Sequence, residues 1–183
     1  MPTETAAGRS DDRVADREPH ALPKGADPRL GTWRTFLHAH ARLTRRLDDE
    51  LRAAHNLSLA EYDALVQLAQ APGRRLRMSV LADRVLLSRS GITRLVDRLV
   101  ADGMVERSTC ATDARGAEAS LTRAGLERLR AASTTHLAGV RRYFLDSIDA
   151  TDRQAIDRGL GQVMDGLDCA PPSALEADLA AEA

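Results

Sequence analysis

The chain has 183 residues, which suits one domain with extensions at its ends. Its 26 cationic and 27 acidic residues give a net charge of −1, so it is not a histone-like polycation. The sequence is 43% hydrophobic but only 3% aromatic, so Leu, Val and Ala must build its core. This composition favours helices over sheets.

Other features of the sequence narrow the class of protein further. No apolar run reaches the about 18 residues that a membrane span needs, and we identify no signal peptide. Cys110 and Cys169 are too few and too far apart for a disulfide framework. We therefore expect a soluble cytoplasmic protein with no membrane partner.

The two ends of the chain differ in composition from its middle. Residues 1–31 are rich in proline and charge and poor in large apolar side chains, which predicts a disordered leader. Residues 169–183 carry acidic side chains and no basic ones, and we interpret them as an acidic C-terminal tail. Residues 32–168 are predicted to form one domain.

The first part of this domain has helical periodicity. Apolar side chains recur at helical spacing over residues 32–55 and predict one long helix. Ser58 and Glu61 form a capping box that predicts the start of a second helix, which Pro72-Gly73 would end. A short helix is expected next, around residues 80–85.

Residues 88–103 have the pattern of an amphipathic helix with a polar first turn. Ser88 is a good N-cap, and Gly103 fits the left-handed position that follows a helix end. Five apolar side chains are expected on its buried side: Ile92, Leu95, Val96, Leu99 and Val100. The opposite side carries polar and basic residues.

After Gly103 the apolar period shortens toward two, which is typical of strands. We predict a hairpin with strands at 104–107 and 117–121 and a turn region at 113–116. Thr122 is then expected to cap a helix that runs to about residue 147. A second capping box, from Thr151 to Gln154, is expected to open a last helix. Its apolar residues are predicted to face inward: Ile156, Leu160, Val163, Met164 and Leu167.

This order of elements predicts a mainly α fold with a small β-hairpin wing, the winged helix-turn-helix. Its second short helix fits the major groove of DNA, where its first residues face bases and phosphates. The helix residues that we expect to bind DNA are Ser88, Arg89, Ser90, Thr93, Arg94 and Arg98. In the hairpin, Arg115 is expected to enter the minor groove and Asp113 to orient an arginine. The alternatives are an ordinary amphipathic surface helix and a solvated turn.

Several short motifs resemble the signature of the MarR family of transcription regulators. They are the pair Ser88 and Ser90, the helix segment Thr93–Leu99, the wing start Gly103–Arg107, the pair Asp113 and Arg115, and Leu121-Thr122 with Gly125. The resemblance covers about residues 32–168. It implies that residues 57–122 form the winged helix-turn-helix and that helices at 32–55 and 122–168 join two subunits in a homodimer.

Such a homodimer would read a pseudo-palindromic operator in double-stranded DNA, with half-sites about one helical turn apart. The resemblance also implies a repressor that a small aromatic or phenolic acid releases from DNA. Candidate residues for binding this effector are Trp33, Phe36, His40, Arg45 and Tyr62. The alternative for each of them is an ordinary core or surface role.

Other functions have weaker support in the sequence. Peroxide sensing in this family uses a cysteine near the first helix, where this chain has none, and Cys110 leaves a redox-modulated or constitutive regulator as an alternative. His38 and His40 lie about 200° apart on a helix and cannot share a metal. We find no phosphate loop or catalytic triad motif, so no enzyme, metal or cofactor is expected. A protein-interaction module would not need the basic residues Arg94 and Arg98.

Overall fold

The computed structural model describes residues 27, 29–110 and 113–167, without the side chains of residues 109, 110 and 113–116. The chain divides into two compact units, Met1–Leu37 and His38–Ala183. Residues 169–183, predicted as an acidic tail, lie outside the described residues, as does almost all of the predicted leader.

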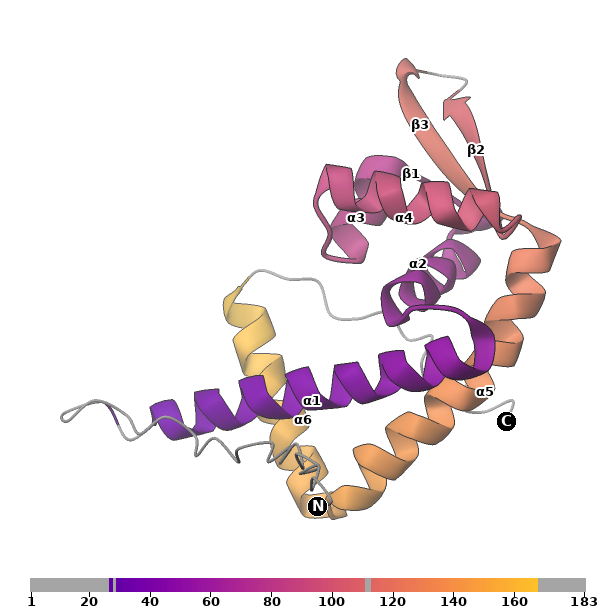
Figure 1. Cartoon of the computed structure of the whole chain (residues 1–183). Helices are drawn as coiled ribbons and strands as arrows, with labels where there is room; N and C mark the ends of the chain where they lie inside the picture. The colour runs from indigo at the N-terminus through magenta and orange to yellow at the C-terminus, as the bar shows by residue number, and fades with distance from the viewer. Residues whose placement is uncertain (1–26, 28, 111–112, 168–183) are drawn as a thin grey trace, which may run out of the picture. The chain divides into compact units, whose positions relative to one another are not determined.

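The described part of the chain is mainly helical, with one small sheet (Figure 1). Its α-helices are α1 (Leu30–His55), α2 (Leu59–Gln70), α3 (Met78–Arg84), α4 (Arg89–Ala101), α5 (Arg123–Tyr143) and α6 (Ala150–Gly166). Two 3-10 turns, η1 (Pro72–Arg74) and η2 (Leu145–Ser147), separate neighbouring elements. The predicted mainly α class with a hairpin wing is confirmed.

The sheet has three antiparallel strands, β1 (Arg75–Arg77), β2 (Val105–Cys110) and β3 (Asp113–Leu121), in the order β1-β3-β2. Strands β2 and β3 extend beyond the helices as a wing (Figure 1). Strand β1 was missed by the sequence analysis. The prediction of a turn at residues 113–116 is wrong, because these residues belong to β3, where Asp113 already pairs with Cys110.

The core lies where α2, α3 and α4 meet the base of the sheet. Its fully buried large side chains are Leu51, Leu57, Leu65, Leu68, Leu81, Ile92, Val96, Leu99 and Val105. The predicted buried side of the 88–103 helix is correct except for Val100, which is 39% exposed. Leucine and valine thus fill a core that has few aromatic side chains, as the composition predicts.

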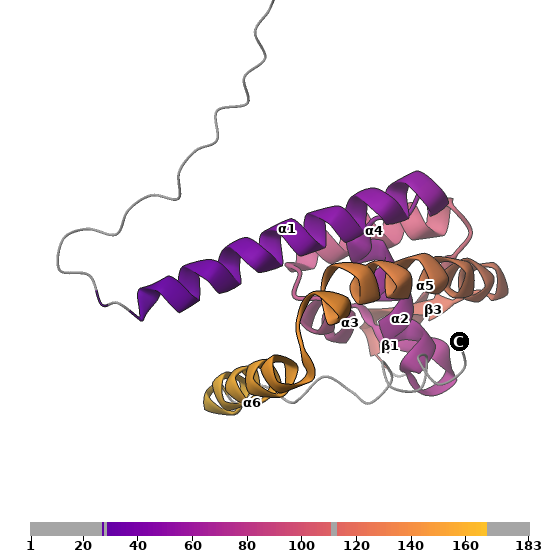
Figure 2. The ribbon, with the colours of Figure 1, turned by 90° about the horizontal axis from the view of Figure 1, so that it is seen from below.

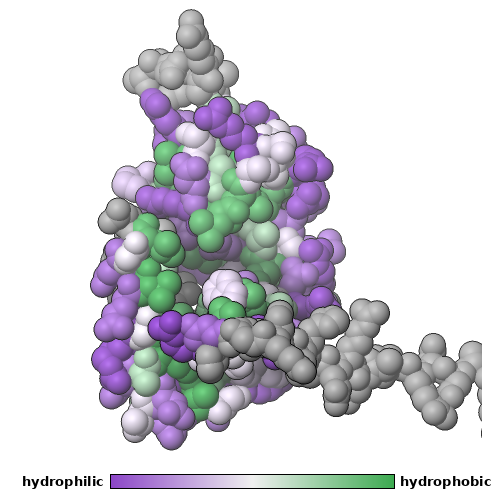
Figure 3. All heavy atoms as spheres, turned by 90° about the vertical axis from the view of Figure 1, so that its left-hand side faces the viewer, coloured by the Kyte–Doolittle hydropathy of each residue, from purple (hydrophilic) through white to green (hydrophobic). Residues whose placement is uncertain are grey.

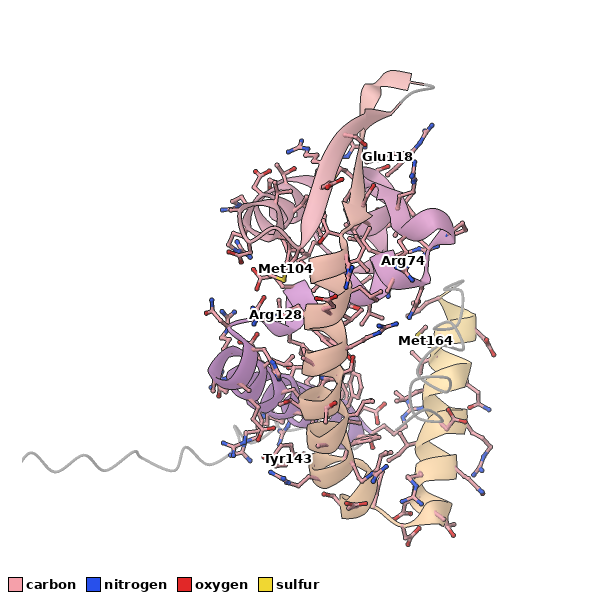
Figure 4. All side chains as sticks on the ribbon, turned by 90° about the vertical axis from the view of Figure 1, so that its right-hand side faces the viewer. Arg74, Met104, Glu118, Arg128, Tyr143 and Met164 are labelled. Carbon is pink, nitrogen blue, oxygen red and sulfur yellow. The ribbon has the colours of Figure 1, made fainter. Side chains whose placement is uncertain are left out.

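Helices α5 and α6 form the second half of the larger unit. Helix α5 runs from the base of the wing, near Met104, to Tyr143 (Figure 4). It ends four residues before the predicted end at 147. The chain then turns through η2 into α6, which projects away from the end of α5 (Figure 2). The N-cap of α6 is Asp149, whose carboxylate accepts from Asp152 N at 2.8 Å, so the predicted Thr151 cap is wrong.

Of the five apolar side chains predicted to face inward, Met164 is partly buried, and the other four are exposed in the single chain, so the prediction is wrong for them. Leu160, Val163 and Leu167 are 41%, 57% and 67% exposed, and Ile156 is also exposed. In the space-filling view of Figure 3, hydrophobic side chains (green) lie on the surface between hydrophilic ones. No residue that the structure describes covers this apolar face of α6.

Candidate nucleic-acid interface

A helix-turn-helix is formed by α3, a short turn and α4. The turn contains Leu86, whose φ of 54° lies in the left-handed region and whose side chain is 92% exposed. Ser88 follows with extended backbone, and its Oγ accepts a hydrogen bond from Gly91 N at 3.1 Å. The predicted N-cap is therefore confirmed, and it fixes where the first turn of α4 begins.

The first turns of α4 present hydroxyl and guanidinium groups to solvent. The Oγ atoms of Ser88 and Ser90 are 3.2 Å apart, and Thr93 Oγ1 donates to Arg89 O at 2.9 Å. Arg94 Nε donates to the Ser90 carbonyl at 3.4 Å. Neither Arg89 nor Arg94 forms an ion pair with another described residue, so both cations are available to an anionic partner.

Arg98, also predicted to bind DNA, has a different environment. Its Nε donates to Glu61 Oε1 at 2.7 Å, which joins α4 to the first turn of α2. The other oxygen of Glu61 accepts from Ser58 N at 2.9 Å and from Ser58 Oγ at 2.7 Å. The predicted capping box of α2 is confirmed, and its glutamate has a second partner that the sequence pattern did not reveal.

Two opposing effects set the pKa of the Glu61 carboxyl. Burial raises it, whereas the hydrogen bonds from Ser58 and Arg98 lower it, and the net result is a pKa below the usual value. Glu61 is therefore ionised at neutral pH, although its side chain is only 12% exposed. The anionic carboxylate provides a fixed anchor for the Arg98 guanidinium.

A second ion pair links α4 to the wing. Arg107 on β2 donates through Nη1 to Asp97 Oδ1 on α4 at 3.0 Å. The two side chains are 41% and 56% exposed, so solvent screens this pair and it contributes little to stability. It does connect the helix and the hairpin that are both expected to contact DNA.

The wing residues predicted to bind DNA are only partly described. Asp113 and Arg115 lie in the first residues of β3, but their side chains are outside the described set. The minor-groove role of Arg115 and the orienting role of Asp113 therefore stay predictions. The side chain of Cys110 also lies outside the described set, so the redox-modulated alternative is not tested.

A pocket of about 800 Å³ lies on the larger unit and is lined by residues of α1, α2 and α5. Three of the predicted effector residues line it: His40 and Arg45 from α1 and Tyr62 from α2. The other two, Trp33 and Phe36, lie in the N-terminal unit, where their rings stack with centroids 5.9 Å apart.

Several residues of this pocket were not anticipated from the sequence. Asp48, Asp63 and Gln70 add polar groups, and His136 contributes from α5, where its ring lies 4.5 Å from that of Tyr62. Burial lowers the pKa of His136, and its Nδ1 has no hydrogen-bond partner among the described atoms. Such residues come together only through tertiary packing, so no local pattern could identify them.

The described residues contain no group of three or more His, Cys, Asp or Glu side chains arranged to hold a metal ion. No helix in the described ranges has the length and apolar character needed to cross a membrane.

Residues 55–116 match the sequence model of the MarR family. No match is found among curated proteins. Among solved structures, the chain is similar to AbsC of Streptomyces coelicolor, a MarR family transcriptional regulator, with 33% identity and a TM-score of 0.72, over 82% of this chain and 99% of AbsC.

Two further solved structures contain DNA. Sco3205 of Streptomyces coelicolor, a MarR family transcriptional regulator in complex with DNA, is 32% identical with a TM-score of 0.72, over 81% of this chain and 94% of that one. A mutant of MarR from E. coli, complexed with operator DNA, is 20% identical with a TM-score of 0.66, over 76% of this chain and 99% of that one. At 20% identity, the similarity to the E. coli protein shows the fold alone.

Proposed function

Since the chain belongs to the MarR family of transcriptional regulators, a family of DNA-binding proteins rather than enzymes, we propose that it is a homodimeric repressor that binds a pseudo-palindromic operator. It would act in the cytoplasm, on the DNA that it regulates.

The observation that carries the proposal is the polar first half of α4. Arg89 and Arg94 project from this surface without ion pairs to other described residues, next to the hydroxyls of Ser88, Ser90 and Thr93. Guanidinium groups suit guanine edges and phosphates, and hydroxyls suit either. The relative Sco3205, which is 32% identical, was solved in complex with DNA, and this supports the same use of the fold here.

The homodimer is supported by the apolar face of α6, which is exposed among the described residues. Leu160, Val163 and Leu167 are exposed at positions three and four residues apart, so they lie on one side of the helix. A surface of this kind is typical of a protein interface. An identical second subunit would cover it and would present two copies of α4 to the two half-sites of an operator.

The effector is proposed to be a small aromatic acid that occupies the pocket of about 800 Å³. Arg45 forms no ion pair with another described residue and can bind a carboxylate, while Tyr62 offers an aromatic ring. Helix α2 contributes Tyr62 to the pocket and Glu61 to the ion pair with Arg98. A ligand there would release DNA only if it binds more tightly to a conformation that cannot bind the operator than to the conformation that can.

Selection of bound sequences from random duplex DNA tests the core of this proposal. We expect the purified chain to enrich an inverted repeat whose half-sites are about one helical turn apart. Enrichment of no sequence would contradict specific recognition. Enrichment of a single unrepeated half-site would contradict the dimer.

A further inference from the structure

Glu61 and Arg98 join two elements that are far apart in the sequence. Glu61 lies in the first turn of α2, and Arg98 lies in α4, 37 residues later. Glu61 was expected only to cap α2, and nothing in that role requires a partner on the DNA-binding helix. The ion pair therefore acts on the Arg98 guanidinium, and the capping of α2 does not explain this second contact of Glu61.

The Glu61 carboxylate is unusually fixed. Oε2 accepts two hydrogen bonds from Ser58, and Ser58 Oγ in turn accepts from Glu61 N at 3.2 Å. Both Ser58 and Glu61 are buried, with exposed fractions of 5% and 9%. Because its other oxygen is held in this way, the carboxylate cannot follow Arg98 as that long side chain moves.

Arg98 itself remains open to solvent beyond this bond. Its side chain is 59% exposed, and the hydrogen bond to Glu61 uses only Nε. Both terminal nitrogens of the guanidinium keep N–H groups for another acceptor. Arg98 lies four residues after Arg94, so the two side chains share one side of α4.

We infer that Glu61 is a positioning residue for DNA recognition, which holds the Arg98 guanidinium so that its terminal N–H groups meet one phosphate in each half-site. This inference rests on the proposed function. A phosphate contact of this kind fixes the position of α4 on the duplex. An arginine side chain without this ion pair would supply the same charge, but its guanidinium would have no fixed position.

An Arg98 side chain held by Glu61 and a free Arg98 side chain affect specific and non-specific DNA binding differently. A fixed Arg98 favours the operator, where α4 must sit in one position. A free Arg98 binds phosphates of any duplex, and loss of the Glu61 negative charge would strengthen non-specific attraction. The ratio of the two affinities is therefore the quantity that Glu61 controls.

The test compares wild type and Glu61→Gln on the selected operator and on a scrambled duplex of equal length. Glutamine also fits the last position of a capping box, so α2 should still form, and circular dichroism and melting temperature check this. We expect operator affinity to fall about tenfold, or about 1.4 kcal/mol. Affinity for the scrambled duplex should stay equal or rise.

Asp102→Asn is the matched control, because it removes one negative charge at the C-terminal end of the same helix, where no ion pair with a described residue is broken. It should leave the ratio of the two affinities unchanged. Arg98→Ala should lower operator affinity at least as much as Glu61→Gln, and adding Glu61→Gln to it should cause no further loss.

Equal losses on both duplexes, or no loss on the operator, would overturn the inference while leaving the proposed function intact. An additional loss in the double variant would also overturn it, because Glu61 would then act by another route. A wild-type chain that does not distinguish the two duplexes would instead refute the proposed function, and this inference with it.

Discussion

Gly125 of α5 lies against the backbone of Met104, at the start of the wing. A Cβ atom at Gly125 would be 2.1 Å from the Met104 carbonyl oxygen. The same carbonyl accepts a hydrogen bond from Thr122 N at 3.1 Å, and Thr122 Oγ1 accepts from Gly125 N at 2.9 Å. The N-cap of α5 and the base of the wing therefore form one close contact.

Gly125→Ala is expected to destabilise the protein. The methyl group would clash with backbone that cannot move without breaking the cap, at a cost of about 3 kcal/mol. Urea denaturation measures the change in the free energy of unfolding. Gly161→Ala is the control, because a Cβ at that position of α6 meets no atom within 4 Å. If the urea midpoint of Gly125→Ala equals that of wild type, the contact between Gly125 and Met104 tolerates a methyl group.

Leu86→Gly is expected to stabilise the protein. Leu86 occupies the left-handed region, which costs a residue with a Cβ roughly 1–2 kcal/mol, and its exposed side chain contributes no packing. We expect the melting temperature to rise by about 2–4 °C for each kcal/mol gained. Leu87→Gly, at the next and partly buried position, should lower it. A lower melting temperature for Leu86→Gly than for wild type would contradict the conclusion that the left-handed backbone conformation of Leu86 destabilises the protein.

His136 is expected to make stability depend on pH. Burial lowers its pKa in the folded chain, so the unfolded chain takes up a proton first as the pH falls. Stability is therefore expected to decrease below the unfolded value of 6.5. His136→Phe keeps a ring against Tyr62 and removes the titrating group. Melting temperatures at pH 7.5 and 5.5 should differ less in this variant than in wild type, and an unchanged difference would refute the assignment.

Leu160→Asp is expected to prevent self-association. An aspartate there is tolerated in the single chain, where Leu160 is 41% exposed, but it would be buried without a partner in a dimer. Sedimentation should give twice the chain mass for wild type and a lower mass for the variant. Gln162→Asp, on the opposite side of α6, should sediment as wild type. Equal masses for wild type and Leu160→Asp would place the interface elsewhere.

The sequence predicted the features of this fold that depend on neighbouring residues. The caps at Ser58, Ser88 and Thr122 were predicted correctly, because each depends on a local pattern. In each one a side-chain hydroxyl accepts a hydrogen bond from a backbone N–H a few residues later in the chain. The three-residue strand β1 was missed because it is too short to show a period, and it is defined by its pairing with β3.

The candidate site was predicted less completely than the fold. The polar residues of α4 followed from the helical period, whereas the pairing of Arg98 with Glu61 joins segments 37 residues apart and has no local signature. The exposed apolar face of α6 was predicted to point inward because a periodic pattern shows that a face is apolar but not what covers it.

The most direct test of the central claim, that α4 reads DNA with Arg89 and Arg94, is the affinity of Arg94→Ala for the selected operator. We expect a loss of about 1–3 kcal/mol, with preference relaxed at one position of each half-site. Arg141→Ala removes an equally charged and exposed side chain from the last turn of α5 and should bind as wild type. Wild-type affinity and sequence preference in Arg94→Ala would contradict the assignment of α4 as the recognition helix.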